Sequence, residues 1–131
     1  MDTLCKCGSN KNYLDCCGSY ITNVKTPSTP EQLMRSRYTA YAVCDIDYIM
    51  NTMHGKPLEG FDVNTVTAWA KAIQWLKLEV LNTFLESEDK GFVEFRAHYS
   101  ENDQHFVLHE ISEFHRQNGK WFYVDGTLLG Q

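Results

Sequence analysis

The second half of the chain alternates between apolar and polar residues, which is the pattern of half-buried β-strands. Four stretches show it, at positions 76–80, 93–99, 106–115 and 121–125. Short polar segments rich in Asn, Asp and Gly separate them, at positions 88–91, 101–103 and 117–119. Such segments favour tight turns between neighbouring strands. The pattern therefore predicts a four-stranded antiparallel sheet built from successive hairpins.

The region before the sheet carries apolar residues at helical spacing instead. Thr29 is suited to an N-cap and Pro30 to a first helical position, so a helix is expected to run from there to about Val43. Two further helices are expected over about 46–52 and 64–73. Helices followed by meandering strands indicate the α+β class.

The N-terminal segment differs from the rest in composition. Residues 1–18 are rich in Cys, Gly, Ser and Lys, and a stretch containing two prolines ends at Pro30. We therefore expect a small knuckle over residues 1–20, a linker over 21–30 and an α+β domain over 31–131. If the linker is a true boundary, residues 1–18 should bury little surface against the main domain.

Four cysteines within thirteen positions are the strongest chemical signal in the chain. They form two close pairs, Cys5 with Cys7 and Cys16 with Cys17. Four thiolates match the closed tetrahedral site of structural Zn²⁺, which has no open position for catalysis. Disulfides, an iron–sulfur cluster and a redox site are the alternatives. They fit less well, because Cys16 and Cys17 are adjacent and neither ferredoxin spacing nor a Cys-X-X-Cys motif is present.

The residues around the first cysteine pair have expected supporting roles. The backbone N–H groups of Gly8 and Ser9 are expected to donate to the sulfurs, and Lys6 and Lys11 to offset the negative charge of the site. Tyr13 and Leu14 offer apolar side chains over which the loop is expected to fold.

Charge and hydropathy narrow the classes of function. The formal net charge is −5, which argues against a broad nucleic-acid-binding face, although a local basic patch stays open. No basic region followed by an apolar run marks a targeting signal, and no apolar stretch is long enough to span a membrane. We therefore expect a cytoplasmic protein with reduced thiols.

The cysteine segment also carries a recognisable motif. The fixed positions are Cys5-X-Cys7-Gly8-Ser9, then Tyr13, then Cys16-Cys17-Gly18. This pattern resembles the SEC-C motif, best known from the C-terminal tail of the protein-export ATPase SecA. In SecA the fourth ligand is often His, whereas here it is Cys17.

The similarity extends along nearly the whole chain. Residues 29–41, 75–81, 108–114 and 121–126 are similar to the bacterial YchJ family. That resemblance implies an NTF2-like middle region, in which three helices and a curved antiparallel sheet form a cone, preceded here by the zinc knuckle. Many members of the family carry a second SEC-C motif near the C-terminus, and these 131 residues hold one copy.

A second candidate site lies on the apolar face of the predicted sheet. By alternation, Glu110 and Asp125 share a face with Trp121, and a carboxylate on an apolar face is costly unless it is paired. Arg37 and Ser112 are the expected neighbours of these carboxylates in a ligand pocket. The alternatives are a satisfied structural carboxylate and a group that serves as a general acid or base.

The opposite face of the sheet should be polar. By alternation, His109, Glu113 and His115 share this face with His98 and Glu94, which favours a solvated surface over a second metal site. A zincin motif is excluded, because it needs His at i and i+4 on a helix.

Two hypotheses of function follow. In the first, the chain is a non-catalytic binding module whose zinc knuckle contacts another molecule. That partner is either a protein or a nucleic acid. In the second, it is an enzyme that uses Glu110 or Asp125 on a small molecule in the pocket. The sequence favours the first, because it shows no nucleophile–base pair and no cofactor fingerprint. It leaves substrate, partner and oligomeric state open.

Overall fold

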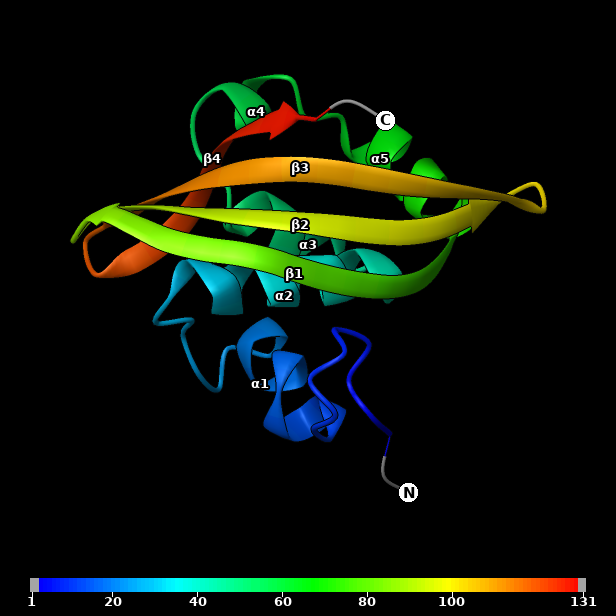
Figure 1. Ribbon diagram of the computed structural model, residues 1–131, viewed down its shortest axis with the longest axis horizontal. Helices are drawn as coiled ribbons and strands as arrows, with labels where there is room; N and C mark the ends of the chain where they lie inside the picture. Colours follow the sequence, from blue (N-terminus) through cyan, green and yellow to red (C-terminus); the bar gives the residue numbers. More distant parts are fainter. Residues whose placement is uncertain (1–2, 130–131) are drawn as a thin grey trace.

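The computed structural model describes residues 3–129, which fold into a sheet with helices packed on one face (Figure 1). The N-terminal part holds a short 3₁₀ helix η1 (Tyr13–Asp15) and helix α1 (Cys17–Ile21). The helices that follow are α2 (Pro30–Ala42), α3 (Ile46–Asn51), α4 (Lys56–Glu59) and α5 (Val63–Ala72). The strands are β1 (Gln74–Ser87), β2 (Lys90–Glu101), β3 (Gln104–Gln117) and β4 (Lys120–Leu128). The expected α+β class and the order of its elements are confirmed.

The helices begin where the capping residues indicate. The side chain of Thr29 accepts a hydrogen bond from the backbone N–H of Gln32 at 3.1 Å, and Pro30 occupies the first helical position of α2. Asp45 caps α3 and Asp62 caps α5 in the same way. The short helix α4 was not expected from the sequence.

The four strands form one antiparallel sheet in the order β1-β2-β3-β4. Two of its hairpins turn through pairs of residues with positive φ. These pairs are Asn102 and Asp103 (φ 53° and 65°) and Asn118 and Gly119 (φ 53° and 81°). Asn, Asp and Gly tolerate this backbone region, so these turns fix the register of the strands on either side. Val93, Phe95 and Ala97 of β2 are buried on the inner face of the sheet, as their alternation predicts.

A β-bulge in β1 changes which side of the sheet one residue faces. Trp75 pairs with Tyr99 and Lys77 pairs with His98, so Leu76 is an extra residue without a partner. Leu76 is consequently exposed, and Trp75 instead packs against the aromatic ring of Tyr38. The alternation expected over residues 76–80 therefore fails at Leu76, because the bulge shifts it by one residue.

The knuckle packs directly on α2, which Figure 1 shows lying between it and the sheet. Cys5, Cys7 and Cys17 are buried in the same apolar cluster as side chains of α2 and the sheet. Arg35 of α2 donates to the carbonyl oxygen of Cys7 at 2.7 Å. The expectation that residues 1–18 bury little surface is therefore wrong. The division into folding units at 1–20, 21–30 and 31–131 stays a prediction.

The outer face of the sheet is polar, as expected. Ring nitrogens of His98, His109 and His115 lie 2.6–2.8 Å from carboxylate oxygens of Glu79, Glu94 and Glu113. Each His is thus engaged by its own Glu, and His109 and His115 do not converge on one point. Among residues 3–129, no helix combines the length and the apolar character that crossing a membrane requires.

Candidate metal centre and internal cavity

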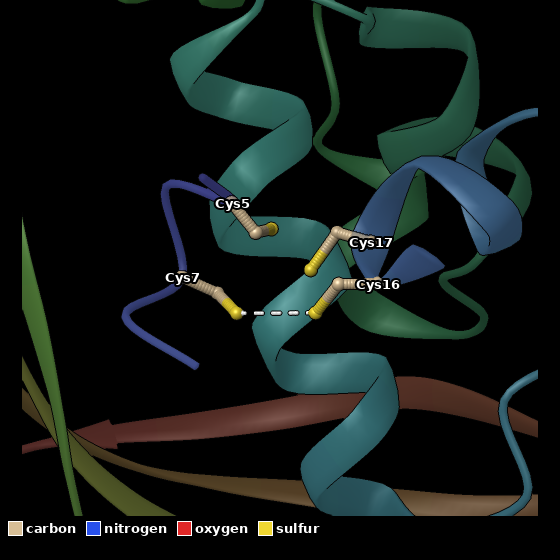
Figure 2. Close-up of side chains that lie close together, drawn as sticks. All are labelled: Cys5, Cys7, Cys16 and Cys17. Atoms are coloured by element: carbon tan, nitrogen blue, oxygen red, sulfur yellow. Dashed lines mark hydrogen bonds between the residues drawn. The ribbon is translucent and has the colours of Figure 1, made fainter. Parts of the chain in front are cut away.

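The four cysteines of the knuckle converge on one point (Figure 2). All four sulfur atoms lie within 4.8 Å of one another, and the sulfurs of Cys7 and Cys16 are 3.6 Å apart. A tetrahedral site with metal–sulfur bonds of about 2.3 Å places its sulfurs roughly 3.8 Å apart. The donor set therefore fits a single metal ion with little rearrangement.

Backbone contacts hold the first cysteine pair in place. The N–H of Cys5 donates to the carbonyl oxygen of Lys11 at 2.8 Å, and Leu4 forms an isolated bridge with Asn12. Gly8 between them has a φ of 84°, a conformation that glycine adopts without strain. The chain thus doubles back and presents Cys5 and Cys7 to the second pair.

The second pair comes from the start of a helix. Cys16 follows η1, and Cys17 is the first residue of α1. In Figure 2 the two side chains point from this helix toward Cys5 and Cys7. A loop and a helix start thus supply two ligands each.

The contacts around the sulfurs differ partly from the expected ones. The hydroxyl oxygen of Ser9 lies 3.1 Å from the sulfur of Cys16, but the N–H of Gly8 donates to the carbonyl oxygen of Cys5. The sulfur of Cys5 also lies 3.7 Å from the hydroxyl oxygen of Thr39 in α2. The sequence motif could not predict the contact of Thr39, because only the packing of the knuckle on α2 brings Thr39 close to Cys5.

The electrostatics of the cluster favour a cation at its centre. Hydrogen bonds from the thiols of Cys17 and Cys7 hold the pKa of Cys5 well below its usual range, and the same contacts raise the pKa of Cys17. Burial raises the pKa of Cys16. A divalent cation stabilises all four as thiolates and reverses this pattern.

The positive charge near the site comes from the helix. Lys6 and Lys11 are exposed on the surface of the knuckle, and their expected role in offsetting charge stays a prediction. Arg35 is closer and is held by an ion pair with Glu31 at 2.9 Å. Burial lowers the pKa of Arg35, but the bond to Glu31 and the attraction of Cys7 outweigh it, so that the net pKa shift is upward.

A second feature is a cavity between the helices and the inner face of the sheet. Its volume is about 150 Å³. Most of its lining is aromatic or aliphatic, and its polar members are Arg37, Glu110 and Ser112 with the tyrosine hydroxyls. The lining residues are Met34, Arg37, Tyr38, Tyr41, Trp69, Trp75, Phe95, Ala97, Leu108, Glu110, Ser112, Phe114 and Tyr123.

Three of the five predicted pocket residues line this cavity. Arg37 is 7% exposed, and its guanidinium donates to the carbonyl oxygen of Ile49 and to Thr52 at 2.8 and 2.7 Å. Glu110 accepts hydrogen bonds from Ser112 at 2.8 Å and from Tyr123 at 3.3 Å. Burial raises the pKa of Glu110 in spite of these bonds, and full burial lowers the pKa of Arg37.

Asp125 and Trp121 lie outside the cavity lining. A bulge in β4 pairs Asp125 with Glu113 but Tyr123 with Phe114, so the predicted alternation breaks at Val124 and Asp125 is exposed. The carboxylate of Asp125 accepts from the N–H of Gly126.

Trp121 is on the inner face but beyond the end of the cavity. There the indole nitrogen of Trp121 donates to the carbonyl oxygen of Ser28 at 3.2 Å. Trp69 and Trp75, by contrast, form part of the cavity wall.

Comparison with known proteins identifies relatives that share this architecture. Residues 29–126 match the family model of the YchJ middle NTF2-like domain. A UPF0225 protein of Vibrio parahaemolyticus is 40% identical over 98% of this chain and 77% of its own length. A UPF0225 protein of Geobacter sulfurreducens is 38% identical over 96% of this chain and 80% of its own length.

Two solved structures of SEC-C motif proteins have the same arrangement. The protein from Rhodopseudomonas palustris has a TM-score of 0.88 and 36% identity, covering 98% of this chain and all of that chain. The protein from Psychrobacter arcticus has a TM-score of 0.84 and 26% identity, covering 98% of this chain and 84% of that one. The expected NTF2-like fold behind a SEC-C motif is confirmed.

Proposed function

The chain belongs to the YchJ, or UPF0225, family, and we propose that it is a zinc protein whose N-terminal knuckle binds another protein. Four sulfur donors in a tetrahedral arrangement suit Zn²⁺, and a site closed by four protein ligands leaves no position for a substrate. Cys5, Cys7, Cys16 and Cys17 hold the ion, which then stabilises the fold of a segment too short to fold alone.

The observation that carries the binding role is the exposure of two leucines on the knuckle. Leu4 and Leu14 are 63% and 69% exposed. Of the two apolar residues over which the loop was expected to fold, Tyr13 packs against the core, whereas Leu14 is exposed. Leu4 forms the isolated bridge with Asn12, and Leu14 lies two residues beyond Asn12 in η1, so both leucines belong to the folded knuckle. Apolar side chains held outward on a rigid segment suit a protein partner better than a nucleic acid.

The test uses substitutions that leave the metal site alone. Proteins captured from a lysate by the zinc-loaded chain are identified, purified and measured individually for affinity. The double variant Leu4→Asp and Leu14→Asp should lower that affinity at least about tenfold, because truncation of buried contacts at an interface costs more than about 1 kcal/mol. Leu128→Asp is the matched control, because Leu128 is 66% exposed on β4. Equal binding by the wild type and the double variant would refute the proposal.

An enzyme is the second candidate, and the buried carboxyl of Glu110 is the observation that favours it. A carboxyl with a raised pKa in an apolar cavity suits a general acid or base. This candidate predicts that Glu110→Gln abolishes turnover while the double leucine variant retains it. The two functions are thus separable by variants, because neither leucine lines the cavity that contains Glu110.

A further inference from the structure

No residue of the knuckle among those described lines the cavity, and its aromatic walls favour ring-shaped ligands. Tyr41 of α2, Trp69 of α5 and Trp75 at the start of β1 form a corner of rings with centroids 5.6–6.1 Å apart. Trp69 is 36% exposed and marks the rim, whereas Phe114 at the inner end is 1% exposed. A planar aromatic ligand would meet ring faces and edges on several sides.

Size sets a second limit on the ligand. The volume of about 150 Å³ is small. An engineered apolar cavity of about 150 Å³ in another protein holds one benzene molecule. The ligand therefore has about one six-membered ring with one small substituent.

The polar residues of the cavity wall, Glu110, Ser112 and Tyr123, indicate the chemical nature of that substituent. The Oε2 atom of Glu110 accepts from both Ser112 and Tyr123, while its Oε1 atom accepts no hydrogen bond from residues 3–129 and stays accessible to solvent. Among the described residues, the one fully buried side-chain polar atom without a partner is Nε1 of Trp75, in the same cavity wall. A half-buried acceptor without a partner is stabilised by a ligand that donates to it. A hydroxyl or amino group on the ring provides this donor.

The positive charge of Arg37 limits which ligand charges the cavity can accept. A carboxylate among aromatic rings would otherwise suit an ammonium group. The guanidinium of Arg37 lines the same cavity, is stacked 4.7 Å from the ring centroid of Tyr123, and forms no ion pair among the described residues. A second cation in this enclosed space would be repelled, because charges in a low-dielectric cavity are poorly screened.

We propose that the cavity binds a small neutral aromatic molecule with one hydrogen-bond donor, of which phenol is the simplest example. Glu110 accepts the donor, and the corner of Tyr41, Trp69 and Trp75 holds the ring. This site is separate from the knuckle, so its failure would leave the protein-binding proposal intact.

The three tryptophans supply internal reporters for the test. Phenol is titrated into the ¹⁵N-labelled, zinc-loaded chain at pH 8, and the indole N–H signals are followed by NMR. The signals of Trp69 and Trp75 should shift and saturate together. The signal of Trp121, outside the cavity, should stay in place. Saturating shifts at Trp121 alone, or no saturable shift at any indole, would overturn the proposal.

Other ligands of the same size test the donor and the charge. Benzene lacks the donor and should bind about tenfold more weakly than phenol, which is the difference that one hydrogen bond to a charged group makes. Benzylammonium should also bind at least about tenfold more weakly than phenol. Equal affinity for phenol and benzene would overturn the role of Glu110, and tighter binding of benzylammonium would overturn the assignment of a neutral ligand. These measurements need no variant.

A matched pair of variants completes the test. Glu110→Gln removes the charged acceptor and should weaken phenol about tenfold while changing benzene less than twofold. Asp125→Asn makes the same chemical change outside the cavity and should alter neither affinity. Equal losses in both variants would show that the carboxyl acts through the fold and would overturn the assignment.

Discussion

Arg35 joins the knuckle to the main domain, and replacing it tests whether the two fold as one unit. Its guanidinium donates to the carbonyl oxygen of Cys7 at 2.7 Å and to Glu31 at 2.9 Å. A hydrogen bond from a charged donor contributes about 1.5–3 kcal/mol, and an i,i+4 ion pair adds about 0.3–0.5 kcal/mol. Arg35→Met keeps much of the aliphatic packing but loses both contacts. The free energy of unfolding should therefore fall by about 2–3 kcal/mol.

Two measurements on the metal-loaded chain follow this change. The melting temperature, measured by circular dichroism, should fall by roughly 6–15 °C in a chain of this size. Release of the metal to a chromogenic chelator should become faster, because Arg35 holds the loop that carries Cys5 and Cys7. Glu31→Gln is the control, since it removes the ion pair but leaves the bond to Cys7, and it should cost less than about 0.5 kcal/mol.

The outcome that refutes this reasoning is specific. If Arg35→Met releases the metal faster but melts at the temperature of Glu31→Gln, the knuckle unfolds on its own and residues 31–131 need no support from it. The burial of Cys5, Cys7 and Cys17 in the common core would then contribute nothing to the main domain.

Three further changes test the metal, the cavity carboxyl and the strand that closes the cavity. The purified chain should hold one Zn²⁺ by elemental analysis, and Cys5→Ser or Cys16→Ser should reduce that content strongly; a metal-free chain with intact thiols would contradict the assignment. Because burial raises the pKa of Glu110, its stabilising contribution is present at low pH and is lost as the pH rises through the folded-state pKa. As the pH rises from 4 to 8, the melting temperature of Glu110→Gln should therefore increase relative to that of the wild type. If the difference between the two melting temperatures stays constant over this range, the pKa of Glu110 is not raised. Gly126→Ala should lower the free energy of unfolding by about 1–3 kcal/mol in denaturant titrations, because the added Cβ meets the Glu110 carboxylate and the Tyr123 hydroxyl; an unchanged midpoint would show that this contact is absent.

The central strands were predictable because local chemistry fixes them. The turn residues Asn118 and Gly119 favour positive φ, and two-residue turns set the register of strands with a clear alternation. The bulges at Leu76 and Val124 were not predictable, because an extra residue leaves no mark in a pattern of apolar and polar positions. Each bulge moved a predicted residue to the other face, and Asp125 left the pocket for this reason.

The two sites differ in how far the sequence could describe them. The four cysteines lie within thirteen positions, so spacing alone predicted that Cys5, Cys7, Cys16 and Cys17 come together as candidate ligands. The residues that support them, Arg35 and Thr39, come from α2 and become neighbours only through tertiary packing.

The cavity depends on tertiary packing even more strongly. Its aromatic wall comes from α2, α5 and β1, which no local pattern relates. Trp69 and Trp75 carry no sign in the sequence that they border a cavity rather than fill the core.

The meander of the sheet has a consequence for how the chain matures during synthesis. Each of β2, β3 and β4 pairs with the strand made just before it, across a turn of two residues, so the sheet assembles through short loops. The contact of Trp121 with Ser28 spans 93 residues and closes only when β4 has left the ribosome. The knuckle and α2 emerge long before that moment. All four cysteines are therefore synthesised before any strand of the sheet, so the complete set of sulfur donors is available before the sheet can assemble.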